Sequence, residues 1–155
     1  MKRMHLHVAV DNVTQSVRFY SALFGVPPTV EKPDYARWML ESPHVNFAIS
    51  SRGAKAGLDH IGIQVETEEE LDEIRTRLEQ AEMSLLTQES TTCCYARSDK
   101  HWVQDPSGIV WESYRTLDSA PTFNNAEMTE GACCTPVMQA IQITPRKSKQ
   151  HHGCC

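Results

Sequence analysis

The sequence lacks long hydrophobic runs and lacks an excess of basic residues, and these two absences exclude several classes of function. No apolar segment approaches the length of about 20 residues that crosses a bilayer. Lysine and arginine number 15 against 20 aspartates and glutamates, for a formal net charge of -5. Nucleic acids and anionic membranes would repel such a chain. With 155 residues, 40% of them hydrophobic and 23% charged, the composition predicts a soluble globular domain.

The beginning of the chain does not resemble a signal peptide. Two basic residues are followed by an apolar run that histidines interrupt and Asp11 ends. We therefore expect a cytoplasmic protein, either a monomer or a homodimer, with a small molecule as its partner and with neither nucleic acid nor membrane bound.

Cysteine does not occur as a single residue anywhere in the sequence, only as adjacent pairs. Secreted proteins spread their cysteines along the chain so that disulfide bonds close loops. Two neighbouring cysteines can close only a strained ring of negligible length, which stabilises little. We interpret the pairs as dithiols in a reducing compartment, available to bind a soft atom: Cys93-Cys94, Cys133-Cys134 and Cys154-Cys155.

Two stretches of the chain are similar to each other at an offset of 60 − 5 = 55 residues. HLHVAVDNVTQSVRFYSAL begins at His5, and HIGIQVETEEELDEIRTRL begins at His60. Each opens with a histidine, alternates apolar residues as a half-buried strand does, and continues with helical periodicity. Thr67 and Glu70 match a capping box at the start of the second helix. The repeat predicts two modules of the same architecture.

Short strand-like runs follow each predicted helix. They are YARWMLE and VNFAISS in the first half, and MSLLTQE, CYA with HWVQ, and IVWESY in the second. The order of strand, helix and about three strands thus occurs twice, and two such units must pack together to cover their sheets. We predict an α+β domain over residues 1–116, built from two tandem βαβββ modules at 1–52 and 57–116. Residues 117–155 show little periodicity, and we expect a flexible, disordered, cysteine-rich tail there.

The repeat places His5 and His60 at equivalent positions on equivalent strands. If the modules pair about a pseudo-twofold axis, the two imidazoles converge in a cleft between them. The last strand adds Glu112, whose neighbours face the opposite side. Two histidines and a carboxylate with open positions suit non-haem Fe(II) and oxygen chemistry. A histidine on a strand is more often a core or surface residue, however, and His7 on the same face is an alternative ligand to His5.

Several motifs, in this order, resemble the vicinal oxygen chelate superfamily. They are the opening histidine, SVRFYSALFG, LDHIGIQVE and DPSGIVWESY, and they cover roughly residues 3–116. That superfamily includes glyoxalase I, the fosfomycin- and bleomycin-resistance proteins, and extradiol dioxygenases. Within it, TTCCYARSDKHWVQDPSG followed by WESY looks most like the organoarsenical carbon–arsenic lyases and their cadmium-induced relatives.

The resemblance implies the vicinal oxygen chelate fold, with a metal-binding cleft between the modules. It also implies an enzyme that depends on Fe(II), or on another divalent metal, and on O2. Such a lyase of the dioxygenase type would cleave the carbon–arsenic bond of trivalent organoarsenicals, for example methylarsenite to arsenite, and confer arsenic resistance. By the same match, His5, His60 and Glu112 would be the catalytic metal ligands, and Cys93 and Cys94 would bind substrate.

The cysteine pair fits an arsenical because trivalent arsenic is thiophilic. A monosubstituted organoarsenical has two exchangeable oxygens, and two thiols that replace them would hold the remaining As–C bond in place. Neighbouring residues of a regular strand face opposite sides, so Cys93 and Cys94 are expected on a loop or bulge. The alternative is that they are two small buried hydrophobic residues. Tyr95, Lys100, His101 and Trp102 are candidates to line the cavity, although lysines and histidines such as Lys100 and His101 are more often ordinary surface residues. We expect Trp38 and Trp111 in the core.

Two other functions fit the same residues. A non-catalytic resistance protein would hold cadmium or arsenite on the three cysteine pairs, with His151 and His152 adding ligands in the tail. A glyoxalase or thiol transferase would consume a glutathione adduct without O2. Against the second alternative, glyoxalase-type sites commonly take a carboxylate from the last strand of module one, and VNFAISS contains no acid, histidine or cysteine.

Overall fold

The computed structural model describes residues 2–52, 54–123 and 136, and it confirms the predicted α+β fold with two βαβββ modules. Module one consists of β1 (Arg3–Ala9), α1 (Val13–Phe24), β2 (Val30–Lys32), β3 (Tyr35–Glu41) and β4 (His44–Ser50). Module two consists of β5 (Gly57–Val65), α2 (Glu68–Gln80), β6 (Leu86–Cys93), β7 (Ala96–Gln104) and β8 (Val110–Ser119).

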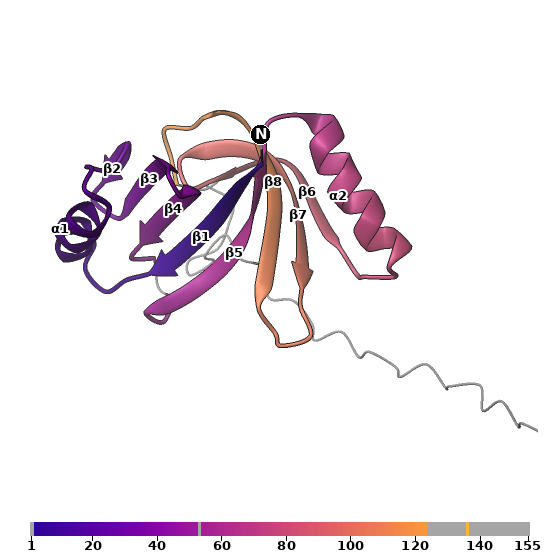
Figure 1. The fold of residues 1–155 in the computed structure, drawn as a ribbon, viewed down its shortest axis with the longest axis horizontal. Helices are drawn as coiled ribbons and strands as arrows, with labels where there is room; N and C mark the ends of the chain where they lie inside the picture. Colours follow the sequence, from indigo (N-terminus) through magenta and orange to yellow (C-terminus); the bar gives the residue numbers. More distant parts are fainter. Residues whose placement is uncertain (1, 53, 124–135, 137–155) are drawn as a thin grey trace, which may run out of the picture.

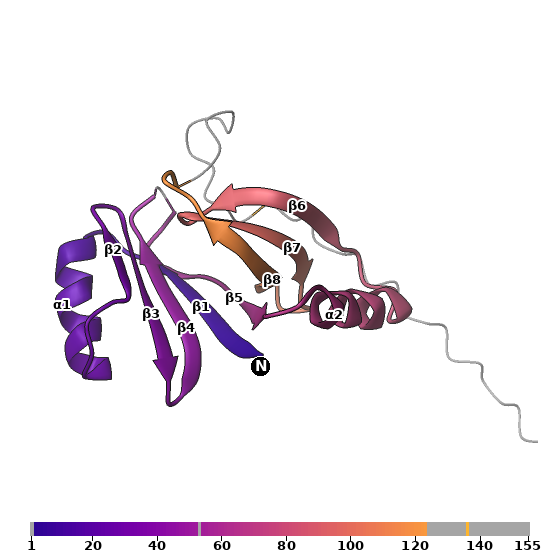
Figure 2. The same cartoon turned by 90° about the horizontal axis from the view of Figure 1, so that it is seen from above.

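The two modules share one eight-stranded sheet in the order β2-β3-β4-β1-β5-β8-β7-β6. The antiparallel pair of β1 and β5 joins them at the centre, and β4 and β8 run parallel to β1 and β5 on either side. The sheet is strongly curved, and α1 and α2 lie at opposite ends of the molecule (Figures 1 and 2). The first strand of each module therefore lies at the middle of the sheet.

The alternation of β1 divides its side chains between an apolar face and a polar face. Leu6 and Val8 pack into a hydrophobic cluster with Trp38 of β3 and with α1. His5 and His7 alternate with them and point to the other face of the sheet. The histidines therefore face away from the core that α1 covers.

Module two repeats this arrangement with a smaller core. Leu71 and Ile74 of α2 pack on Val65 of β5. The predicted cap is present at the start of α2: the Glu70 amide donates to Thr67 Oγ1, and the Glu70 carboxylate accepts from the amide of Glu66, which precedes the N-cap. Neither helix among the described residues has the length and apolarity needed to cross a membrane.

The predicted boundary at Thr116 falls inside β8, which continues to Ser119. Phe123 is buried against Tyr35 and Cys93, beside the turn that follows β6. Residues up to Phe123 thus pack with the domain that the sequence places at 1–116. The rest of the predicted tail lies outside the described residues apart from position 136, and so do its four cysteines and both of its histidines.

Candidate functional site

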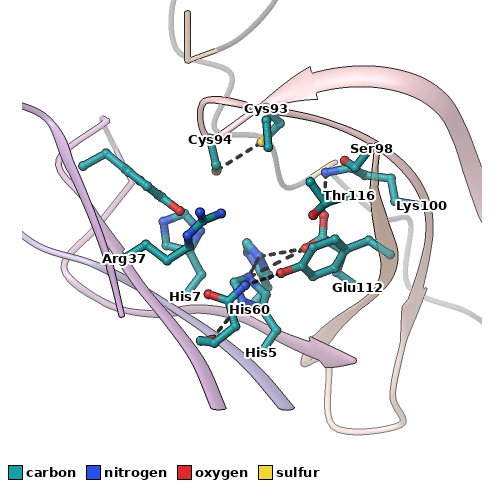
Figure 3. Close-up of a pocket in the computed structure, with 14 residues that line it drawn as sticks. His5, His7, Arg37, His60, Cys93, Cys94, Ser98, Lys100, Glu112 and Thr116 are labelled. Carbon is teal, nitrogen blue, oxygen red and sulfur yellow. Dashed lines mark hydrogen bonds and ion pairs between the residues drawn. The ribbon is translucent and has the colours of Figure 1, made fainter. Parts of the chain in front are cut away.

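His5 and His60 converge at the centre of the sheet, as the repeat predicts. The Nε2 atoms of the two rings lie 3.2 Å apart, and both side chains are buried. Figure 3 shows them at the base of a pocket lined by residues of both modules. The antiparallel pairing of β1 with β5 within one chain brings them together, since it places each module's opening histidine on the same face.

Glu112 of β8 completes the predicted triad. Its Oε2 lies 3.8 Å from His5 Nε2 and 3.5 Å from His60 Nε2. In the sheet register, Gly62 of β5 stands between them, opposite His5 on one side and Glu112 on the other. A Cβ atom at Gly62 would lie 2.0 Å from the Glu112 carbonyl oxygen, so only glycine fits there. The missing side chain also leaves His5 and Glu112 free to approach across β5.

A third imidazole, His7, belongs to the same cluster. One ring nitrogen of each of His5, His7 and His60 lies within 4.8 Å of the others. The sequence presents His7 as an alternative to His5, but the structure brings both rings into the pocket (Figure 3). His7 is 1% exposed, and its Nε2 is 2.8 Å from the Ser50 hydroxyl.

The second ring nitrogens of His5 and His60 are held by acceptors outside the histidine cluster. His5 Nδ1 is 3.1 Å from the Asn46 carbonyl oxygen, and His60 Nδ1 is 2.9 Å from Asp59 Oδ1. In this structure the two Nε2 atoms share a hydrogen bond, and with Nδ1–H donating outward each could present a lone pair to a bound metal. Metal-binding histidines are typically oriented in this way.

Burial and charge set the protonation of the cluster. Burial, followed by repulsion from His60, lowers the pKa of His5 to about 4, and burial with the neighbouring rings lowers that of His7 to about 3. Burial acts in the same direction on His60, but Asp59 and Glu112 outweigh it, so its pKa is raised. Two of the three imidazoles are therefore neutral near pH 7 without a metal.

Glu112 is ionised because Lys100 and the hydrogen bond from His60 favour its charged form. Burial alone would raise its pKa, but Lys100, His60 and His5 together hold that pKa far below its usual range. The Lys100 ammonium on β7 donates to Glu112 Oε1 at 2.6 Å. Oε2 is the carboxylate oxygen that approaches the histidines, so the lysine and the histidines contact different oxygens.

Trp102 and His101, which were also expected near the cavity, lie in different places. Trp102 packs edge-on against the His60 ring with 5.2 Å between centroids, whereas His101 faces a different surface pocket and contacts Thr87. Of the two tryptophans expected in the core, Trp38 is fully buried, but Trp111 is half-buried and donates to Asp105.

Cys93 and Cys94 lie at a tight turn, as the need for two sulfurs on one side predicts. Cys93 ends β6, Ala96 begins β7, and the two loop residues Cys94 and Tyr95 have φ values of 55° and 60°. Two-residue hairpins of this kind require positive φ at both loop positions, where glycine or asparagine is usual. The turn brings the Sγ atoms of Cys93 and Cys94 to 3.2 Å from each other.

The cysteine turn faces the histidine cluster across the same pocket (Figure 3). The space open to water there is small, about 30 Å³. Cys93 is disulfide-bonded in this structure. Binding of one atom by both sulfurs therefore requires the reduced chain.

The side chains that face the pocket fit a divalent transition metal. Imidazole nitrogens suit iron, zinc and related ions, whereas magnesium and calcium prefer sites made of oxygen ligands. The pocket offers three imidazoles and one ionised carboxylate as ligands. Hydrogen bonds to groups outside the histidine cluster orient the three rings.

Sequence reasoning missed the residues that support the triad. Asp59 precedes His60 directly in LDH, and a carboxylate beside a candidate ligand is a usable signal. Asn46 contributes a backbone carbonyl, which any residue would provide, so its role leaves no trace in the sequence. Gly62 could have been suspected as a glycine inside a strand, where close approach of another backbone is a common cause.

Comparisons with known proteins identify the family, similar sequences and a shared fold. The sequence profile of the Glyoxalase/Bleomycin resistance protein/Dioxygenase superfamily matches residues 2–113. A trivalent organoarsenical cleaving enzyme of Bacillus sp. (strain MD1) is 38% identical over 100% of this chain and 99% of its own. The cadmium-induced protein CadI of Mycobacterium bovis is 32% identical over 81% of this chain and 83% of its own. An extradiol ring-cleaving dioxygenase from B. fuscum shares the fold, with a TM-score of 0.58 and 18% identity over 76% of this chain and 33% of the dioxygenase.

Proposed function

This chain belongs to the Glyoxalase/Bleomycin resistance protein/Dioxygenase superfamily, and we propose that it cleaves the carbon–arsenic bond of trivalent organoarsenicals with Fe(II) and O2. One observation carries the proposal. The sulfurs of Cys93 and Cys94 lie 3.2 Å apart in a pocket that also contains the two histidines and Glu112. The Bacillus relative is named a trivalent organoarsenical cleaving enzyme and is similar over the whole chain, which supports the substrate class of this proposal.

In this proposal, His5, His60 and Glu112 hold the iron. Bound Fe(II) would supply the redox chemistry that brings O2 to react with carbon. Asp59 and the Asn46 carbonyl keep the two Nε2 atoms turned to the cluster. Lys100 keeps Glu112 ionised through Oε1, so Oε2 remains available as a ligand.

The two thiols bind and orient the substrate. Methylarsenite exchanges its two hydroxyls for the sulfurs of Cys93 and Cys94, and two water molecules leave with the thiol protons. The methyl group is then the third substituent on arsenic, and the turn directs it toward the histidine cluster. The reacting groups thus meet in a fixed geometry, which replaces a diffusive encounter.

Tyr95 and Asp34 hold the cysteine turn against module one. The Tyr95 hydroxyl donates to Asp34 Oδ1 at 2.6 Å, and the Tyr95 ring packs on Tyr35. This contact ties the residue after Cys94 to β3 and its preceding loop. Movement of the two sulfurs relative to the histidines is thereby restricted.

The overall reaction balances without another reductant or oxidant. One methylarsenite and one O2 give one arsenous acid and one formaldehyde. Carbon is oxidised by four electrons, O2 accepts the same four electrons, and arsenic stays trivalent. The polar groups of the pocket are buried, which limits the access of bulk water during the reaction.

The test begins with full-length protein reduced with a phosphine, because a dithiol reductant would itself bind arsenic. The reduced protein is loaded with Fe(II) under anaerobic conditions, mixed with methylarsenite, and then exposed to air. We expect arsenite and formaldehyde in equal amounts, only after air is admitted and only with iron. Absence of both products with every divalent metal tested would refute the proposal.

Variants separate turnover from simple sequestration. Cys94→Ser is expected to abolish turnover while Fe(II) binding persists. A full-length variant with serine at all four tail cysteines is expected to keep its turnover. The four tail cysteines are Cys133, Cys134, Cys154 and Cys155. A protein that only sequesters arsenic would lose most of its binding capacity in this variant and would release no formaldehyde.

A further inference from the structure

His7 is a buried histidine of the pocket that the proposed function leaves unused. Its side chain is 1% exposed, and its Nδ1 has no hydrogen-bond partner among the residues that the structure describes. A buried polar nitrogen without a partner is costly, and native proteins seldom retain one without a ligand, an ion or a water to satisfy it. The pocket therefore contains a buried nitrogen that lacks a partner among the described residues.

The hydrogen bonds of the three imidazoles follow one pattern. His5 and His60 are each bound outside the cluster through Nδ1, which leaves Nε2 turned inward. His7 is bound through Nε2 to the Ser50 hydroxyl, and its Nδ1 has no partner among the described residues. Each ring thus has one nitrogen bound to an oxygen outside the cluster, which is the arrangement of histidines that ligate metals.

The distances also suit a shared ion. A ligating nitrogen lies about 2.1 Å from a transition metal, so two nitrogens on opposite sides of it are separated by about 4.2 Å. One nitrogen of each of the three rings already lies within 4.8 Å of the others. A movement of a few tenths of an ångström by each ring would bring all three within ligating distance of one ion.

We propose that His7, through Nδ1, is a fourth protein ligand of the metal, so that the site consists of three histidines and Glu112. The inference rests on the metal site of the proposed function and adds one ligand to it. Module one then contributes two ligands from β1, and β4 contributes the Ser50 hydroxyl that orients the second of them. His7 would thus leave fewer positions on the ion for O2 than a site of two histidines and Glu112 would.

The test counts the histidines bound to a paramagnetic probe, Co(II). Each ligated imidazole gives a strongly shifted proton signal from its other nitrogen, and the signal disappears in D2O. The parent is the full-length chain with its tail cysteines replaced by serine and its tail histidines by glutamine, so that only the pocket binds Co(II). The replaced residues are Cys133, Cys134, His151, His152, Cys154 and Cys155. We expect three exchangeable signals in this parent.

His7→Gln and His7→Phe are compared with the parent. We expect two signals in each variant and a loss of Co(II) affinity of at least roughly 10- to 100-fold. Loss of a hydrogen-bond partner of a ligand already has an effect of that size, and loss of the ligand itself should not be smaller. Because either variant could lose stability, circular dichroism and thermal unfolding are recorded for both. His44→Gln, at a half-buried histidine at the start of β4, is the matched control and should change neither readout.

The outcomes separate this inference from the proposed function. Two signals in the parent, with unchanged affinity in both folded His7 variants, overturn the fourth ligand while the metal site stands. If the parent binds no Co(II) or Fe(II), the metal site itself fails and His7 fails with it. Ser50→Ala gives an independent check, since it should keep three signals but shift the one that belongs to His7.

Discussion

The Nε2 atoms of His5 and His60 lie 3.2 Å apart although 55 residues separate the two histidines along the chain. The contact exists because β1 and β5 are antiparallel neighbours at the centre of one sheet. Each strand carries its apolar side chains toward its own helix, so each histidine is left on the opposite face. Joining the modules through their first strands therefore creates the site.

Glu112 and Lys100 form a buried ion pair, so loss of one charge should destabilise the fold. Glu112→Gln leaves the Lys100 ammonium without its carboxylate, and we expect a loss of about 3 kcal/mol in the free energy of unfolding. The double variant Glu112→Gln/Lys100→Met should recover much of that stability but no metal binding. Urea unfolding and Fe(II) dialysis measure the two effects, and Glu69→Gln on the exposed side of α2 is the control. Equal stability of the two variants would contradict this prediction.

Gly62→Ala should damage the site through the backbone. The added methyl would meet the Glu112 carbonyl oxygen at 2.0 Å, so β5 and β8 would have to separate. We expect a cost of about 1–3 kcal/mol in the free energy of unfolding, together with weaker metal binding. Ser119→Thr adds one methyl at the exposed end of β8 and should change neither. Wild-type metal affinity in folded Gly62→Ala would show that this spacing is not needed.

The metal-free protein should lose stability as the pH falls below neutrality. The folded pKa values of His5 and His7, about 4 and 3, lie below the ordinary value of 6.5. Their contribution is therefore fully present above pH 6.5, and it declines at lower pH because the unfolded chain binds these protons first. At pH 5 the loss is about 2 kcal/mol for each ring. His60, with its raised pKa, opposes part of this loss.

Urea unfolding of the metal-free protein between pH 5 and pH 7 measures this dependence. His7→Gln should show a shallower slope than the wild type, since one of the two contributing imidazoles is gone. The exposed-side variant Glu69→Gln should keep the wild-type slope. An identical slope in His7→Gln would show that His7 titrates alike in the folded and unfolded chains.

The cysteine turn should show a conflict between stability and function. Cys94 has a φ of 55°, a conformation that costs most residues other than glycine about 1 kcal/mol or more. Cys94→Gly should therefore raise the free energy of unfolding by roughly that amount, and Cys94→Ser should leave it nearly unchanged. Both variants should lose tight binding of methylarsenite, which tryptophan fluorescence or mass spectrometry would detect. Tight binding in either variant would mean that one sulfur suffices.

The sequence by itself determined the elements and their order, because those follow from local periodicity and from a repeat that is visible without coordinates. It also indicated His5 and His60 as candidate ligands, since equivalent positions of a repeat become equivalent positions in space, and strand alternation added Glu112. The need for a turn at Cys93-Cys94 followed as well, because two sulfurs on one side are incompatible with a regular strand.

Only the tertiary structure decided what surrounds those residues. That Gly62 must lack a side chain depends on how closely β8 approaches β5, and the orientation of His60 depends on a contact with Asp59. The free Nδ1 of His7 depends on which nitrogen Ser50 occupies. These features arise from contacts between strands far apart in the chain, and such contacts are fixed by packing of the whole sheet rather than by the pattern of any one segment.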